Sequence, residues 1–288
     1  RHLWSGSAMI WTSTGLTDLA LVDPAAGLVC TAIDVGWPQT RAVASNRPLA
    51  DGTDDTTAYI GARSVTMQFT IAAGTRTRAQ NRALLASFCH PGRRSVLKFD
   101  GAMLNPASGS TNRMMTLRCD QGSAPIDNRF HTAVAVTAIA PTGLIEAITA
   151  TTVTVDPLAP ADGAPFDWTW PVSFPAASPT ATVATSAGSM AAWPTIRIDG
   201  PCYGPVVACG ALLLSFPELA IDAGHYLMID TAARTVLLDG TADRRSSLDP
   251  AVSAWWQIQP GTNDLFFTPE LSGPDAEATV TWRDTYFL

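Results

Sequence analysis

Lysine is almost absent from this chain, and charge of either sign is scarce. Lys98 is the only lysine among 18 basic residues, charged residues make up 15% of the 288 residues, and the net charge is −7. Proteins that bind nucleic acid by neutralising phosphates need a concentrated basic face. The sequence indicates no such face, so we expect DNA near this protein to be repelled rather than held.

Long apolar runs and a secretory signal are also missing. The most hydrophobic stretches, residues 130–148 and 206–221, are interrupted by proline, glycine and glutamate. Neither reaches the roughly 20 apolar residues that span a bilayer, so we expect no membrane insertion. The opening RHLWSGSAMIW lacks the basic start, apolar core and cleavage site of a signal peptide. Arg1 without a preceding methionine suggests a chain trimmed or incompletely described at its start.

The sequence motifs of common catalytic and metal sites do not occur. There is no G-x-S-x-G pentapeptide, no Walker-type phosphate loop and no H-E-x-x-H spacing. The five scattered cysteines favour buried reduced thiols, although a Cys202–Cys209 link across a glycine-containing turn stays open. The four glutamates single out no pair for glycoside hydrolysis. We therefore expect no enzyme activity, no cofactor and no metal.

Short alternating segments separated by turns dominate the rest of the sequence. Residues 64–71 alternate apolar with polar side chains, which is typical of a half-buried strand. Over residues 76–88, leucine and phenylalanine recur at helical spacing and arginines supply a polar face, so one helix is predicted there. Further strands are predicted at 7–11, 28–35, 95–100, 114–119, 130–140, 195–199, 211–216, 226–230, 235–238, 265–268 and 278–287.

Two segments are too rich in chain breakers for regular structure. Residues 36–55 form a polar excursion with two prolines and a DGTDD cluster. Residues 156–192 carry six prolines, which predicts an extended crossing that lies partly against a domain face or an adjacent subunit. The predicted organisation is an N-terminal β domain over 1–155, this crossing over 156–192 and a C-terminal β-sandwich over 193–288.

Four sequence segments carry a resemblance to a known family. They are AIDVGWPQTRAVASNRPLADGTDDTTAYIGARSVTMQFTI, WPTIRIDGPCYGPV, YLMIDTAARTVLLDG and WWQIQPGTNDLFF. In this order they resemble the distal tail protein (Dit) family of long, flexible-tailed bacteriophages, over roughly residues 28–100 and 193–288. The resemblance implies a mostly β protein, with an N-terminal ring-forming domain that has one helix and a C-terminal galectin-like antiparallel sandwich.

The resemblance also implies an architectural function in the virion. The protein, made in the cytoplasm of the bacterial host, would form a homo-hexameric ring at the distal end of the tail. The ring would join the tail tube protein to the tail-tip and receptor-binding proteins and leave a channel that DNA crosses without specific binding. The chain is too short for a large inserted sugar-binding module, so scaffolding is favoured over direct host-sugar binding.

Charged residues of the polar excursion are the candidate ring and channel contacts. Its acids can face the channel and repel DNA, or they can form a solvated turn. Its flanking arginines can pair with acids of a neighbouring subunit, or they can be ordinary surface residues. The candidate residues are Arg41, Arg47, Asp51, Asp54, Asp55 and Arg63.

Aromatic residues are the candidate contacts of the outer domain. Trp255 and Trp256 are adjacent, so in a strand they point to opposite faces: one is in the core and the other is exposed or covered by a partner, with packing of both in the core as the alternative. Trp168, Trp170 and Trp256 are the candidate partner-facing aromatics. Trp282, Tyr286 and Phe287 are expected to fill the interior of the sandwich or its edge. An adhesion or receptor-binding protein that binds carbohydrate through exposed tryptophans is the alternative function, and a hydrolase is a weaker third.

Overall fold

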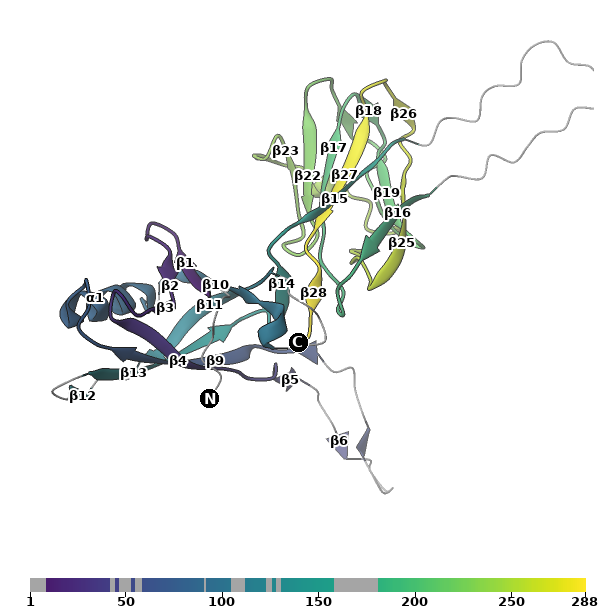
Figure 1. Ribbon diagram of the computed structural model, residues 1–288. Coiled ribbons are helices and arrows are strands. Elements are labelled where there is room, and N and C mark those ends of the chain that lie inside the picture. Colours follow the sequence, from purple (N-terminus) through teal and green to yellow (C-terminus); the bar gives the residue numbers. More distant parts are fainter. Residues whose placement is uncertain are drawn as a thin grey trace, which may run out of the picture. The chain divides into compact units, whose positions relative to one another are not determined.

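The computed structural model describes residues 9–41, 45–46, 53–54, 59–90, 92–104, 112–122, 126–127, 131–157 and 181–288. The chain divides into two compact units, Arg1–Ile148 with Tyr286–Leu288, and Thr149–Thr285. Within the described ranges nearly all regular structure is β-sheet, with one α-helix, α1 (Arg78–Phe88) (Figure 1). The mostly β fold class with one helix, expected from the sequence, is confirmed.

The first unit is built on an 11-stranded sheet. Its main path runs β2-β1-β10-β11-β13-β9-β4-β3, while β12 pairs with β13, and β14 pairs with both β11 and β28. The strands are β1 (Ile10–Ser13), β2 (Leu19–Ala20), β3 (Val22–Asp23), β4 (Leu28–Val35), β9 (Arg63–Ile71), β10 (Arg94–Asp100), β11 (Asn112–Gly122), β12 (Ile126–Asp127), β13 (Thr132–Ala140), β14 (Ile145–Ala147) and β28 (Thr285–Tyr286).

Alternation along the strands and one helix fill the core of the first unit. Every second residue of β9, from Arg63 to Ile71, is buried, as the period of a strand dictates. The helix starts at Arg78, later than the predicted residue 76, because Thr77 and Gln80 form a capping box. At the other end of the helix, Phe88 packs on Trp11 with ring centroids 5.1 Å apart.

The polar excursion contains short paired strands, which the sequence did not predict. Strands β5 (Thr40–Arg41) and β8 (Tyr59–Ile60) pair antiparallel, and so do β6 (Ser45–Asn46) and β7 (Thr53–Asp54). The second pair is nested within the first along the chain, and we call these four short strands together the arm.

The second unit is a sandwich of antiparallel sheets. A six-stranded sheet has the order β15-β27-β17-β22-β23-β24, a four-stranded sheet the order β16-β25-β19-β20, and a three-stranded sheet the order β21-β18-β26. The strands are β15 (Thr151–Val155), β16 (Thr182–Ser186), β17 (Thr195–Asp199), β18 (Cys202–Tyr203), β19 (Val206–Cys209), β20 (Leu212–Ser215), β21 (Ala220–Ile221), β22 (Tyr226–Asp230), β23 (Thr235–Leu238), β24 (Ala242–Asp243), β25 (Gly261–Phe267), β26 (Leu271–Ser272) and β27 (Glu277–Trp282).

One hydrophobic core joins the two larger sheets of this unit. Ile196 and Leu227 from the six-stranded sheet share it with Val207 and Phe267 from the four-stranded sheet, and all four are fully buried. The hairpin β22–β23 has the predicted bounds. Arg234, in its turn, has a φ of 56°, a left-handed conformation that such a tight turn needs.

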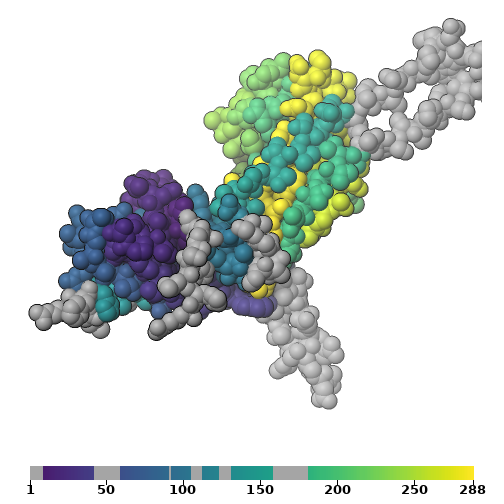
Figure 2. Space-filling view, in the orientation of Figure 1, coloured from purple at the N-terminus to yellow at the C-terminus, as the bar shows by residue number. Residues whose placement is uncertain are grey.

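The boundary between the units differs from the predicted one at both crossings. The second unit starts at Thr149, because β15 pairs along its whole length with β27; teal β15 and yellow β27 adjoin on its surface in Figure 2. The predicted final strand, 278–287, is divided into β27 and β28. Residues Tyr286–Leu288 therefore belong to the first unit and do not fill the sandwich, whereas Trp282 is buried in it as expected.

Candidate functional site

Two of the candidate ring contacts, Arg41 and Asp54, lie in described strands of the arm. Arg41 is exposed in β5, opposite Tyr59 of β8. Asp54 lies in β7, where the backbone alone is described. Three further candidates, Arg47, Asp51 and Asp55, lie outside the described residues.

The base of the arm is held by backbone contacts with the sheet. The amide of Gly36 donates to Ser64 O at 2.9 Å, and the amide of Gln39 donates to Ala62 O at 3.0 Å. A Cβ on Gly143 would stand 2.1 Å from Gly61 O, and the φ of Gly143 is +67°, so glycine is required where this turn meets the arm. These contacts therefore fix the segments that connect the arm to the sheet of the first unit.

Two exposed aromatics at this base were missed by the sequence analysis. Trp37 is 70% exposed and Tyr59 is 63% exposed, both unusually high for side chains of this size. The ring of Trp37 meets that of Phe287 edge-on, with centroids 5.5 Å apart. Their exposure could not be predicted from the sequence, because aromatic residues flanked by proline, glycine and threonine follow no periodic pattern. Together with Arg41 we call them the arm-base surface.

Arg63 is not a surface residue, and its predicted role as a contact to a neighbouring subunit is wrong. Strand β9 begins one residue earlier than predicted, so Arg63 falls on the buried face and is fully buried. Its Nε donates to Gly143 O at 3.1 Å, and Nη2 donates to Phe287 O. Burial lowers the pKa of its guanidinium.

Trp256 is also buried, so it does not face a partner or a sugar. Its exposure is 1%, and Trp255 packs against the same core. The expectation of opposite faces assumed a strand, but the chain is irregular here, and the alternative that both side chains pack on the core is the one observed. The other two candidate aromatics, Trp168 and Trp170, lie outside the described residues.

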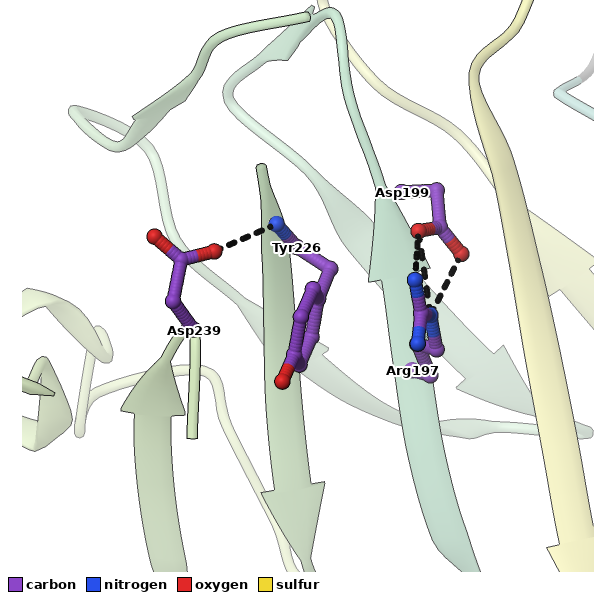
Figure 3. Close-up of polar contacts among 4 residues, drawn as sticks. All are labelled: Arg197, Asp199, Tyr226 and Asp239. Carbon is purple, nitrogen blue, oxygen red and sulfur yellow. Dashed lines mark hydrogen bonds and ion pairs between the residues drawn. The ribbon is translucent and has the colours of Figure 1, made fainter. Parts of the chain in front are cut away.

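A group of polar side chains lies on one face of the six-stranded sheet of the second unit (Figure 3). Arg197 pairs with Asp199 through contacts of 2.6–3.0 Å, and its guanidinium lies 4.0 Å from the ring centre of Tyr226. Asp239 accepts from the Tyr226 amide at 3.1 Å and lies 2.7 Å from the His225 ring nitrogen. These groups satisfy one another and hold the hairpin end in place.

Electrostatics give the His225–Asp239 pair a charged state at mildly acidic pH. The hydrogen bond from His225 lowers the pKa of Asp239, and the bond to Asp239 raises the pKa of His225 above its usual 6.5. The side chains of His225 and Asp239 are 53% and 38% exposed. The described ranges contain no cluster of three His, Cys, Asp or Glu side chains able to hold a metal ion.

All five cysteines are free thiols, so the Cys202–Cys209 link left open by the sequence is not formed. Burial raises the pKa of Cys30 and of Cys202 to about 11 and that of Cys89 to about 12. Thiols in this state are poor nucleophiles and poor metal ligands. Among the described helices, none is long and apolar enough to cross a membrane.

The chain was compared with known proteins. The family model of the siphovirus-type tail component, C-terminal domain, matches residues 187–286. The solved structure of SPP1 Dit (gp 19.1), described as a paradigm of the hub adsorption apparatus in phages that infect Gram-positive bacteria, is similar over 96% of this chain and 98% of that chain. That pair is 14% identical with a TM-score of 0.65.

A chain of the phage p2 baseplate, in its activated conformation with Sr, is similar over 96% of this chain and 98% of that chain. It is 10% identical, with a TM-score of 0.48. No curated protein matches the sequence significantly. Residues 187–286 are therefore similar to the C-terminal domain of siphovirus-type tail components, and the chain shares the fold of SPP1 Dit over 96% of its length.

Proposed function

We propose that this chain is a structural protein of a siphophage virion, a distal tail protein that forms a ring where the tail tube meets the tail-tip complex. The observation that carries the proposal is a shared fold over 96% of this chain and 98% of SPP1 Dit. The similarity to SPP1 Dit includes both units, and the family match falls independently on the second unit.

In this proposal the first unit forms the ring and the second unit faces outward. The ring is a homo-hexamer that encloses a channel for DNA, and the outer units meet tail-associated and receptor-binding proteins. The net charge of −7 favours passage of DNA without specific binding, since like charges repel. Asp51, Asp54 and Asp55 are the residues we assign to the channel side of the arm.

We assign the contact between neighbouring copies to the arm and its base. Trp37 and Tyr59 offer large apolar surface, and aromatic residues and arginine are enriched at the centres of protein interfaces. Arg41 and Arg47 supply cations, and the aspartates of a neighbouring arm supply anions. A second copy of this chain therefore matches the arm-base surface both in apolar area and in charge.

The test is the oligomeric state of the purified chain and of a double variant. Arg41→Ala with Tyr59→Ala alters two of the three residues of the arm-base surface and leaves Trp37, which contacts Phe287, in place. We expect the unaltered chain to form hexameric rings in native mass spectrometry and negative-stain images. The double variant should dissociate at concentrations at least about tenfold higher, because losing interface aromatics and arginine costs more than about 1.4 kcal/mol.

The matched control lies in the second unit. Tyr203 and Leu271 are cross-strand neighbours that are 37% and 69% exposed, so Tyr203→Ala with Leu271→Ala removes a similar area far from the arm in sequence. This control should leave the ring intact. A folded chain that stays monomeric both alone and when mixed with tail-tube protein contradicts the proposal.

A further inference from the structure

The chain passes between the two units twice. It leaves the first unit after Ile148, and it returns at Tyr286 after 137 residues in the second unit, so the three residues Tyr286–Leu288 belong to the first unit. Figure 1 places the end of the chain beside β14 and β9. We propose that Arg63 and Arg113 form a clasp, a binding site in the first unit for the segment Tyr286–Leu288, and that the clasp makes this passage a releasable second tether.

Both arginines of the clasp are buried and bind the segment directly. Arg63 is fully buried in β9, and Arg113 is 3% exposed in β11. Arg63 Nη2 donates to Phe287 O, and Arg113 Nη1 donates to Leu288 O at 2.9 Å. Two separate strands of the sheet therefore supply the two donors.

Aromatic rings complete the clasp. The Arg113 guanidinium lies 3.8 Å from the ring centre of Tyr286, a short cation–π distance, and the Arg63 guanidinium lies 5.9 Å from that of Phe287. Phe287 also contacts Trp37 in a T-shaped arrangement. The segment thus presents two carbonyl oxygens and two aromatic rings to groups that recognise both.

Two guanidinium nitrogens without hydrogen-bond partners in the described part of the chain support an open state of the clasp. Within the described residues, Arg63 Nη1 and Arg113 Nε have no hydrogen-bond partner. A buried guanidinium with an unpaired nitrogen is poorly satisfied, and water can satisfy it when the segment leaves. Closing the clasp gains carbonyl and ring contacts, and opening it gains hydration, so the two states compete.

The chain just before the clasp is fixed within the second unit. Asp284 Oδ1 accepts from Ser186 Oγ at 2.8 Å and from Trp282 Nε1 at 3.1 Å, and Thr285 O accepts from the Met190 amide at 3.0 Å. No loop separates this anchor from the clasp, since Thr285 and Tyr286 are consecutive. The clasp therefore decides whether the second unit is attached by one passage of chain or by two.

Strand β14 offers a direct test, because it pairs with β28 on one side and β11 on the other. Opening the clasp turns β14 into an edge strand. Glu146 lies in β14, and the three other glutamates, Glu218, Glu270 and Glu277, lie in the second unit. With a glutamate-specific protease, the rate of cleavage after Glu146 therefore reports the opening of the clasp, and cleavage after the other three glutamates serves as an internal control.

We expect cleavage after Glu146 to be at least about tenfold faster in Arg113→Met and in a chain that ends at Thr285, since a hydrogen bond to a charged group contributes enough for one order of magnitude. Cleavage after the other three glutamates should stay unchanged. Arg118→Met is the matched control, because Arg118 is an exposed arginine on the same strand, β11. It should cleave like the unaltered chain.

Hydrogen exchange of β9 and β13 separates release of the segment from unfolding. These central strands should keep their protection in both altered chains. Unchanged cleavage after Glu146 in the chain that ends at Thr285 overturns the clasp. Equal loss of protection across β9 and β13 also overturns it, because the arginines would then support the whole sheet. Ring formation is measured separately, so failure of the clasp leaves the proposed assembly standing.

Discussion

Two tryptophans of the second unit differ in burial, and we expect them to differ in how much they contribute to the free energy of unfolding. Trp256 is 1% exposed within the shared core, whereas Trp193 is 41% exposed. We expect Trp256→Ala to lower the free energy of unfolding by about 3–5 kcal/mol, the usual range for removing a buried aromatic. Trp193→Ala should cost on the order of 1 kcal/mol. Chemical denaturation monitored by the remaining tryptophans measures both.

Trp256→Phe refines this prediction. The indole nitrogen of Trp256 has no hydrogen-bond partner within the described residues, so phenylalanine removes an unsatisfied donor and keeps an aromatic ring. Its loss of stability should be clearly smaller than that of the alanine variant. Equal losses for Trp256→Ala and Trp193→Ala would contradict the burial described above.

His225 and Asp239 make the hairpin end sensitive to pH. The pKa of His225 is raised, so its contribution to stability is complete below its unfolded value of about 6.5 and is lost as pH rises through the folded value. The pKa of Asp239 is lowered, so its contribution is present above about 3.8 and is lost as pH falls through the folded value. Both charges are present between these limits.

A titration of His225 by NMR tests this pair. Asp239→Asn removes the negative charge and keeps a residue that tolerates the φ of 51° at this position. We expect the pKa of His225 to lie above 6.5 in the unaltered chain and to fall toward it in the variant, where Asp222 alone still raises it. A His225 pKa at or below 6.5 in the unaltered chain would show that the pair does not form in solution.

Residue roles were predictable from the sequence where a period applied and not elsewhere. The alternation of β9 identifies its buried side chains, and starting that strand one residue earlier would have placed Arg63 among them. Trp256 was predicted to face a partner because adjacent residues of a strand point to opposite faces, and this rule does not hold in an irregular segment. The exposure of Trp37 and Tyr59 depends on how the arm leaves the sheet, which no local pattern encodes.

At the scale of elements, the start of α1 depends on one cap. Thr77 Oγ1 accepts from the Gln80 amide at 3.2 Å, and Gln80 Oε1 accepts from the Thr77 amide at 2.8 Å. Thr77→Ala should destabilise the first unit by about 1 kcal/mol, the typical loss for an N-cap. Gln80→Glu keeps the capping box and should be nearly neutral. Thermal unfolding of both variants measures the difference, and equal stability of Thr77→Ala and the unaltered chain would contradict the role of the cap.

Elements with a regular pattern and a local turn were the most predictable. β4, β17, β22 and β23 have the expected bounds, since each combines alternation or an apolar run with a clear turn. The two-residue strands of the arm escaped prediction, because backbone pairing alone defines them. The division of the last strand also escaped, since only Arg283 and Asp284 separate β27 from β28 in the sequence.

At the scale of the whole molecule, the contacts that define the units are distant in sequence. Arg63 and Phe287 are 224 residues apart, and Arg113 and Leu288 are 175 apart. No window of sequence contains such a pair, so composition and periodicity predict two β-rich regions and leave the second passage of the chain hidden. The order of motifs along the chain does carry the fold of distal tail proteins, which the comparison with SPP1 Dit supports.

The central claim, a ring protein at the distal end of a siphophage tail, is tested most directly by locating the protein in the virion. Electron microscopy of particles labelled with antibodies against the second unit gives that position. The account predicts label at the tail tip, symmetric about the tail axis, with none on the capsid. Label along the tail tube or on the capsid, or virions that lack the protein, would contradict it.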